Sequence, residues 1–220
     1  MDISELDEFS EVFSENKLGT LPGKVKLHTD MTITPSIASS RRVPMALKAR
    51  LKQELNRLES SQVIKKVSEP TDWVNTLVVT TKNSGNIRIC IDPKQLNKAL
   101  KRHHYLSATL EEILPELTKA KVFLSCDLKS GYHHIKLDED SSKLTTFITP
   151  HGRYRYLRLP FGLNVSSEIF QSRLNEALEG LQGVLCIADD IFIYGCGDTV
   201  EEAEKDHDNK LKTFLERCTL

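Results

Sequence analysis

The stretch Val184-Leu185-Cys186-Ile187-Ala188-Asp189-Asp190-Ile191-Phe192-Ile193-Tyr194 places two adjacent carboxylates between two short apolar runs. Both runs are rich in strand-forming residues, and the polar break between them predicts a β-hairpin. Aspartate tolerates turn dihedrals, so the pair could be an ordinary turn. Because the runs are apolar on both faces, we expect the hairpin tip to abut other structure. Two buried like charges are unfavourable unless a cation neutralises them, so the pair is a candidate metal site.

A third carboxylate ends a comparable strand upstream. The apolar run Val122-Phe123-Leu124-Ser125-Cys126 is followed directly by Asp127. Hard oxygen ligands in small number suit Mg²⁺, which keeps several waters and takes substrate phosphates as its remaining ligands. If Asp127 lies beside the hairpin, the three carboxylates could hold two metal ions, which would serve an attacking oxygen and a leaving group. The sequence leaves open whether the carboxylates converge.

Helices and short strands alternate around these carboxylates. The runs 77–81 and 86–91 flank a turn cluster and predict a second hairpin. Apolar spacing predicts helices from Pro44, from about Ser166 and over 200–218. The capping-box spacing of Thr109 and Glu112 predicts another helix near 109–119. Residues 24–29 alternate in polarity and could form one strand. The mixture is typical of an α+β fold with a mainly antiparallel sheet.

Charge is distributed unevenly along the chain. The net charge is −1, yet residues 41–104 carry 14 Lys or Arg against five acids, whereas residues 1–16 carry six acids and no base. A basic stretch of this kind suits a polyphosphate partner. A solvated basic face without a partner would have the same composition, so both interpretations stay open.

Composition also bears on the compartment. The longest apolar runs fall far short of the roughly 20 residues that span a bilayer, and the N-terminus lacks the pattern of a secretory signal. The five cysteines show no CxxC spacing, which argues against structural zinc and against a disulfide framework. We therefore expect an intracellular protein that is neither secreted nor membrane-bound. The sequence does not distinguish a location in a cytoplasmic virus-like particle from one in the nucleus.

Four motifs follow one another in a recognisable order. They are residues 86–92 with Leu96-Asn97, residues 122–133 (VFLSCDLKSGYH), residues 159–163 (LPFGL) with Phe170-Gln171, and residues 187–190 (IADD). In this order they resemble the fingers signature and motifs A, B and C of reverse transcriptases from gypsy-type long-terminal-repeat retrotransposons. The resemblance runs from about Val43 to Cys218.

This resemblance implies the fingers and palm of a right-hand polymerase, with a mainly antiparallel palm sheet, packed helices and no thumb. It implies an N-terminal arm or linker at 1–42 and a reverse transcriptase domain at 43–220. The fingers would cover about 43–108 and 145–160, and an incomplete palm about 109–144 and 161–220. A ribonuclease H domain is expected in the full Pol polyprotein but not in this chain.

The implied activity is RNA-directed DNA polymerisation, in which a primer 3′-hydroxyl attacks a dNTP on an RNA or DNA template. Two Mg²⁺ ions, or Mn²⁺, would be held by Asp127, Asp189 and Asp190, the catalytic carboxylates, with the Leu128 carbonyl as a further metal ligand. Residues expected to bind the dNTP are Lys82 and Arg88 at the triphosphate, the Ser130 and Gly131 amides, Tyr132 as a gate against a ribose 2′-hydroxyl, and Phe161. Residues expected at the template and primer are Gly162, Gln171, Ile187 and Ala188.

Two departures from the family pattern stand out. Ile187 occupies the position, two residues before the paired aspartates, where the family has Tyr or Phe; this bears on primer positioning and not on metal binding. Motif B usually continues with Asn-Ala-Pro, whereas this chain continues with Asn164-Val165-Ser166-Ser167-Glu168.

Simpler interpretations of single residues stay open. Lys82 and Arg88 could be solvated charges, Tyr132 a core aromatic, and Gln171 a surface residue. Two other functions also stay open. The chain could be a catalytically silent, truncated remnant that at most binds nucleic acid or protein. It could also be a metal-dependent nuclease, which would need neither the hairpin cations nor an aromatic gate.

Overall fold

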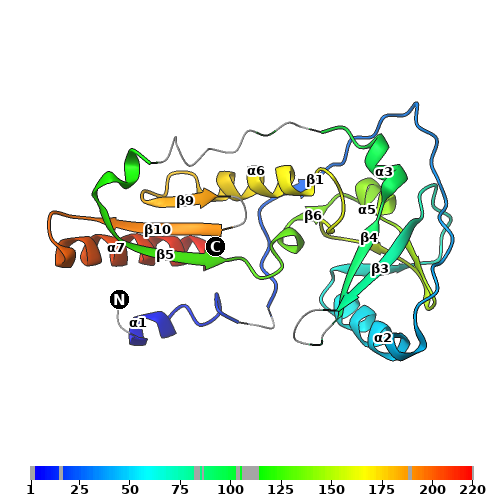
Figure 1. Ribbon diagram of the computed structural model, residues 1–220, viewed down its shortest axis with the longest axis horizontal. Helices are drawn as coiled ribbons and strands as arrows, with labels where there is room; N and C mark the ends of the chain where they lie inside the picture. The colour runs from blue at the N-terminus through cyan, green and yellow to red at the C-terminus, as the bar shows by residue number, and fades with distance from the viewer. Residues whose placement is uncertain are drawn as a thin grey trace. The chain divides into compact units, whose positions relative to one another are not determined.

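The computed structural model describes residues 3–14, 17–81, 85, 87–102, 105, 114–187 and 190–219, and Figure 1 shows their helices and strands. The chain forms two compact units, each assembled from separate stretches. Unit 1 comprises Met1–Gly19, Tyr105–Gly131 and Gln171–Leu220, and unit 2 comprises Thr20–His104 and Tyr132–Phe170.

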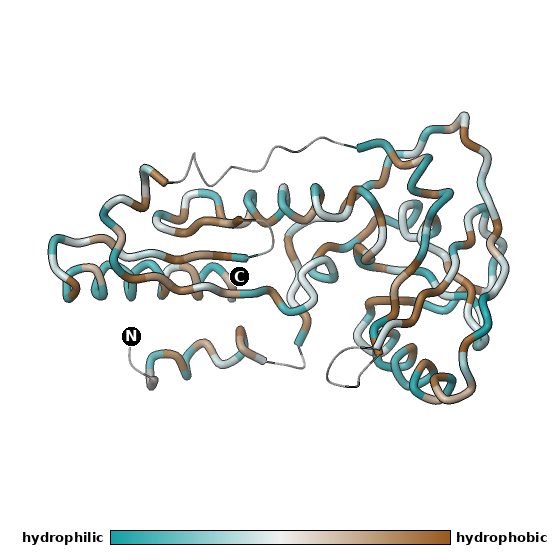
Figure 2. Tube along the Cα trace, viewed as in Figure 1, coloured by the Kyte–Doolittle hydropathy of each residue, from teal (hydrophilic) through white to brown (hydrophobic). Residues whose placement is uncertain are grey.

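Unit 1 is built on a three-stranded antiparallel sheet with the order β5-β10-β9. Its strands are β5 (Ala120–Asp127), β9 (Val184–Ile187) and β10 (Asp190–Cys196), and Figure 2 shows how hydrophobic β9 and β10 are. The unit also holds the short helix α1 (Ile3–Asp7) and the 3₁₀ turn η1 (Glu116–Lys119).

Helix α7 (Val200–Thr219) runs along this sheet (Figure 1). Thr199 and Glu202 form a capping box at its start, because each side chain accepts a hydrogen bond from the other residue's backbone N–H. Gly195 lets the helix approach β10 closely, since a Cβ there would lie 2.1 Å from the carbonyl oxygen of Ala203. The buried residues of α7 are Ala203, His207, Leu211, Phe214 and Leu215.

Unit 2 is built on a five-stranded sheet with the order β2-β8-β7-β3-β4. Neighbouring strands are antiparallel except for the parallel pair β3 and β7. The strands are β2 (Ile64–Val67), β3 (Asn75–Thr81), β4 (Ile87–Asp92), β7 (Phe147–Thr149) and β8 (Gly152–Tyr156). The ring of Phe147 packs near those of Tyr154 and Tyr156, with centroids 6.1 and 5.3 Å away, and all three residues are buried.

Short elements complete unit 2. Helix α2 (Met45–Ser60) buries Leu51, Leu55 and Leu58. The other elements are α3 (Lys94–Ala99), α5 (Glu139–Leu144) and the parallel pair β1 (Lys24–Val25) and β6 (Lys136–Leu137). The 3₁₀ turn η2 (Gly131–His134) and helix α6 (Ser166–Leu178) each contribute residues to both units.

The predicted α+β class is confirmed, as are the helices from Pro44, from Ser166 and over 200–218, and both predicted hairpin strand pairs. The expected strand at 24–29 is wrong beyond Lys24–Val25. Of the helix expected near 109–119, residues 109–113 lie outside the described residues, and 116–119 form a 3₁₀ turn. The limits of fingers and palm stay predictions.

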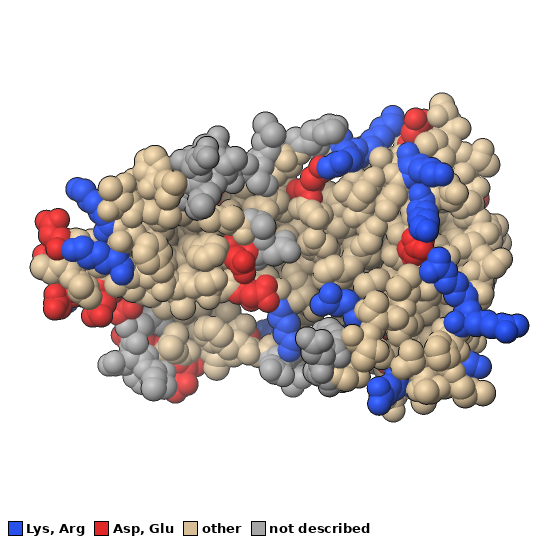
Figure 3. Space-filling model, viewed as in Figure 1, with Lys and Arg blue, Asp and Glu red and all other residues tan. Residues whose placement is uncertain are grey.

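The basic stretch of the sequence becomes a basic surface. All 13 described Lys and Arg residues between positions 41 and 104 are exposed. Figure 3 shows Lys and Arg side chains gathered over the unit that carries β3 and β4. Across the described segments, no helix combines the length and hydrophobicity that crossing a membrane requires.

Candidate active site

Two of the three predicted catalytic carboxylates lie directly opposite each other. Asp127 is the last residue of β5, Asp190 is the first residue of β10, and the two are antiparallel partners. Opposite residues of such a pair share one face of the sheet, with Cβ atoms about 4.5–5.5 Å apart. The convergence that the sequence left open therefore holds for this pair. Asp189, which precedes Asp190, lies outside the described residues.

The carboxylate pair projects from the face of the sheet that α7 does not cover. Gly195 of β10 lies against α7. Because side chains alternate along a strand, Ile191 and Ile193 lie on the same face of the sheet as Gly195. Asp190 and its partner therefore belong to the opposite face. Both aspartates are exposed. Burial was expected for the Asp189-Asp190 pair, and for Asp190 this expectation is wrong, because Asp190 stands at a strand end on a face without the helix.

The geometry of this pair suits a divalent cation. Like charges directly opposite each other destabilise a sheet, and a cation between them would remove that repulsion. The spacing also lets one oxygen of each carboxylate reach a single Mg²⁺ at its usual distance of about 2.1 Å. No group of three or more His, Cys, Asp or Glu residues suited to a metal occurs among the residues described. In the predicted set of ligands, this pair would supply two.

The turn after β5 contains the predicted carbonyl ligand and the predicted amide donors. The Gly131 amide donates to the Leu128 carbonyl oxygen at 3.0 Å, and Ser130 has a φ of 57°. A positive φ is uncommon for serine and marks type II turns at this position. The Leu128 carbonyl keeps a second lone pair for a metal. The Gly131 amide already has an acceptor, so binding a triphosphate would require sharing or opening that bond.

Three predicted nucleotide-binding residues of unit 2 meet around one ring. The ring of Phe161 lies 4.7 Å from that of Tyr132, and the Arg88 guanidinium carbon lies 5.3 Å from the Phe161 centroid. Arg88 is exposed on β4 and forms a cation–π contact, so it is not simply a solvated charge. Tyr132 is half-buried, so it is not a fully buried core aromatic. We call Tyr132, His133, Phe161 and Phe170 the aromatic cluster.

The turn that carries Phe161 is fixed by an asparagine that was given no role from the sequence. The Asn97 side chain donates to the Gly162 carbonyl at 3.0 Å and accepts from the Asn164 amide at 3.0 Å. The Asn164 side chain donates to the Asn97 carbonyl at 2.9 Å. The position of Asn97 in the fingers signature was the one available signal, and it did not indicate a clamp.

Gly162 is required where it stands, and Gly162→Ala tests this. Its φ is 106°, and an added Cβ would lie 2.4 Å from the Ile91 carbonyl oxygen. Strain and collision together should lower the free energy of unfolding by about 3 kcal/mol, measured by urea denaturation. The control is Gly180→Ala, which has a φ of 83° but nothing within 4 Å and should cost only about 1 kcal/mol. Equal losses would contradict the close-contact explanation.

The ring of His133, beside Tyr132, is held neutral. Burial, followed by the positive charges of Arg57 and Arg158, lowers the pKa of His133 to about 4. Its Nε2 atom is shut off from solvent and has no hydrogen-bond partner among the described atoms. His133 lies in the 3₁₀ turn η2 and packs edge-on against Phe161, with centroids 5.6 Å apart. A proton on this ring would therefore disturb the aromatic cluster.

The low pKa of His133 predicts acid sensitivity. The unfolded chain binds this proton below about pH 6.5 and the folded chain only near pH 4, so the stability is fully present above pH 6.5 and is lost as the pH falls. Between pH 7 and pH 5 the loss should be about 2 kcal/mol, measured by urea denaturation. His133→Gln should remove this part of the slope. An unchanged slope in His133→Gln would contradict the assignment.

Of the residues predicted at the template, the primer and the triphosphate, four remain to be located. Gln171 is buried, and its side-chain amide donates to Cys186 Sγ on β9 at 3.3 Å, so the surface alternative is wrong. Ile187 is half-buried and is the strand partner of Asp190. Lys82 and Ala188 lie outside the described residues.

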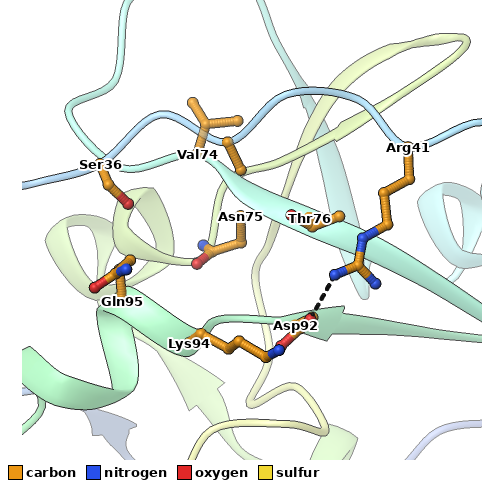
Figure 4. A pocket seen from close by; sticks show the side chains of 9 residues that line it. Ser36, Arg41, Val74, Asn75, Thr76, Asp92, Lys94 and Gln95 are labelled. Carbon is orange, nitrogen blue, oxygen red and sulfur yellow. Dashed lines mark hydrogen bonds and ion pairs between the residues drawn. The ribbon is translucent and has the colours of Figure 1, made fainter.

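Unit 2 also contains a small hollow beside β4 (Figure 4). Arg41 and Asp92 form an ion pair of 2.9 Å at its rim, and its volume is about 110 Å³. Ligand sites usually exceed about 300 Å³, so this hollow suits a few water molecules. Polar residues that line it include Ser36, Asn75, Thr76, Lys94 and Gln95.

Comparison with known proteins gives one consistent answer. Residues 80–220 match the sequence family described as reverse transcriptase (RNA-dependent DNA polymerase). The chain is 33% identical over 201 residues to the K02A2.6 protein of Caenorhabditis elegans, covering 90% of this chain and 16% of that protein. It is 36% identical over 155 residues to the Pol polyprotein from transposon gypsy of Drosophila melanogaster, covering 70% and 14%. The chain thus spans about a sixth of the length of these relatives.

Solved structures show the same fold. A foamy viral protease-reverse transcriptase in complex with an RNA/DNA hybrid matches with a TM-score of 0.78 and 21% identity, over 97% of this chain and 28% of that one. The native prototype foamy virus protease-reverse transcriptase matches with a TM-score of 0.77 and 19% identity, over 98% and 29%.

The two-unit α+β fold, with a carboxylate pair at its strand ends, is therefore that of a polymerase fingers and palm. The chain belongs to the reverse transcriptase family, as a region of the gypsy-type long-terminal-repeat retrotransposon Pol polyproteins. Members of this family are nucleotidyltransferases that generally use divalent metals.

Proposed function

We propose that this chain supplies the nucleotide-transfer site of an RNA-directed DNA polymerase active in retrotransposon replication. In this reaction the primer 3′-hydroxyl attacks the α-phosphate of a dNTP, on an RNA or DNA template, and pyrophosphate leaves. The observation that carries the proposal is the cross-strand pair of Asp127 and Asp190, present in a chain of the reverse transcriptase family.

The carboxylates are proposed as metal ligands. Asp127, Asp189 and Asp190 would hold two Mg²⁺ ions, or Mn²⁺, together with the Leu128 carbonyl. When bound, these cations supply positive charge for activating the attacking oxygen and for the leaving pyrophosphate. Strand pairing holds Asp127 opposite Asp190, which supports this role because neither ligand would depend on a flexible loop.

The residues around Phe161 are proposed to bind the nucleotide. The Arg88 guanidinium rests with its carbon over the Phe161 ring, and stacking of this kind leaves the N–H edge of an arginine free for phosphate oxygens. Lys82 would add a second positive charge, and the Ser130 and Gly131 amides would act as further donors. Tyr132 would close the space that a ribose 2′-hydroxyl needs.

Template and primer are proposed to lie against Gly162, Gln171, Ile187 and Ala188. The exposed Lys and Arg residues of the basic surface support binding of a nucleic-acid backbone. The foamy viral relative was solved with an RNA/DNA hybrid, and we extend that kind of partner to this chain. A nuclease would not need the Arg88, Tyr132 and Phe161 arrangement, so the polymerase is preferred.

Extension of an oligo(dT) primer on poly(rA) tests the proposal. The protein is expressed from the full reading frame that contains these 220 residues, with dTTP and Mg²⁺. We expect incorporation that EDTA stops and that added Mg²⁺ or Mn²⁺ restores. No incorporation with either cation, on RNA or on DNA templates, would contradict the proposed function and favour a silent remnant.

A further inference from the structure

The ring of Tyr132 is held at three points within unit 2. Its centroid lies 4.7 Å from that of Phe161 and 5.3 Å from that of Phe170. Its hydroxyl lies 3.0 Å from Ser167 Oγ, and either oxygen can donate in this hydrogen bond. Two ring contacts fix the plane of the tyrosine, and the hydroxyl contact fixes the direction of its long axis.

We propose that Ser167 is a positioning residue for Tyr132 and thereby sets the selectivity between deoxyribonucleotides and ribonucleotides. This inference rests on the proposed polymerase function and on the gate role of Tyr132. Ser167 acts only through its hydrogen bond to the tyrosine hydroxyl. The bond limits the rotation of the Tyr132 side chain, so that the ring stays where a 2′-hydroxyl would collide with it.

The two adjacent serines at the start of α6 have different tasks. Ser166 is buried, and its hydroxyl donates to the Pro160 carbonyl at 2.8 Å, so it stabilises the turn before the helix. Ser167 is exposed, and its hydroxyl meets Tyr132.

A gate of this kind depends on the position of the ring as well as on its size. A rejected 2′-hydroxyl and an accepted 2′-hydrogen differ by one atom, and packed surfaces discriminate over a fraction of an ångström. An unanchored tyrosine would keep both ring contacts but could swing its hydroxyl end aside. One net hydrogen bond typically shifts such an equilibrium by about fivefold.

The experiment is single-nucleotide incorporation by the full-reading-frame protein, with dTTP and UTP compared on poly(rA). In Ser167→Ala, the ratio of kcat/KM for dTTP to that for UTP should fall about fivefold, through faster use of UTP and with dTTP unchanged. Ser167→Thr keeps the hydroxyl and should restore the ratio. Tyr132→Phe should match Ser167→Ala, and the double variant should lose no more than either single variant, because both remove the same bond.

Controls separate this inference from the function beneath it. Ser172→Ala, in the same helix, should leave the ratio unchanged. This result would exclude a general effect of alanine on the stability of α6 as the cause of the change in Ser167→Ala. If Tyr132→Ala lowers the ratio but Ser167→Ala does not, the positioning role is overturned and the gate survives. An equal loss with dTTP and UTP in Ser167→Ala would mean that Ser167 serves template or primer, and would also overturn the inference. If Tyr132→Ala leaves the ratio unchanged, the gate itself fails.

Discussion

Asp127→Asn should lower primer extension in Mg²⁺ at least about a thousandfold, because a metal ligand contributes several kcal/mol to the stabilisation of a transition state. Asparagine keeps the size of the side chain but removes the charge that faces Asp190 across the strands. The measurement is dTTP incorporation on poly(rA) by the full-reading-frame protein. Asp189→Asn should have a comparable effect.

The effect of Asp127→Asn on activity must be distinguished from an effect on folding. Opposed like charges cost a sheet about 0.5 kcal/mol, so without metal Asp127→Asn should be at least as stable as the parent in urea. Asp72→Asn, at an exposed position of unit 2, provides the same substitution elsewhere and should keep full activity. An Asp127→Asn protein that is folded and as active as the parent would end the polymerase assignment.

Tyr132→Ala should allow the polymerase to incorporate ribonucleotides. Removing the ring should lower the selectivity for dTTP over UTP by about a hundredfold, since a steric collision in a packed site costs 1–3 kcal/mol. Incorporation of dTTP should change much less, because the ring is proposed to exclude a hydroxyl and not to hold the sugar. The measurement is kcat/KM for each nucleotide.

Tyr132→Phe is the matched control for this substitution. It keeps the ring and its contacts with Phe161 and Phe170, and loses only the hydrogen bond to Ser167. Its selectivity should therefore fall far less than that of the alanine variant. If both variants lose selectivity equally, the ring is not the barrier.

Strand periodicity and turn chemistry made the main elements predictable. The apolar runs on either side of Asp189-Asp190 became β9 and β10, and the run before Asp127 became β5. Sequence could not show which strands pair, because pairing depends on distant contacts. The order β5-β10-β9 brings Asp127 opposite Asp190, and this order emerges only in the folded chain. The expectation that Asp190 is buried failed because apolar strands do not reveal which face of a sheet a helix will cover.

For the site residues, too, the sequence predicted identities but not contacts between distant elements. Arg88, Tyr132 and Phe161 were predicted from motifs, but their contact around one ring joins β4, η2 and the turn before α6. Asn97 and Ser167 had no assigned roles, because a polar side chain that binds another element leaves no periodic signal. For Gln171, expected at the template, the alternative of a surface residue failed because the side chain is buried against Cys186.

Titration of the 220-residue chain with Mn²⁺, followed by the electron paramagnetic resonance signal of the free ion, tests the proposed metal site without requiring catalysis. The parent should bind Mn²⁺, Asp127→Asn and Asp190→Asn should each bind it at least about tenfold more weakly, and Asp72→Asn should match the parent. Equal binding by all four proteins would contradict the claim that the carboxylates at the ends of β5 and β10 hold the catalytic cations.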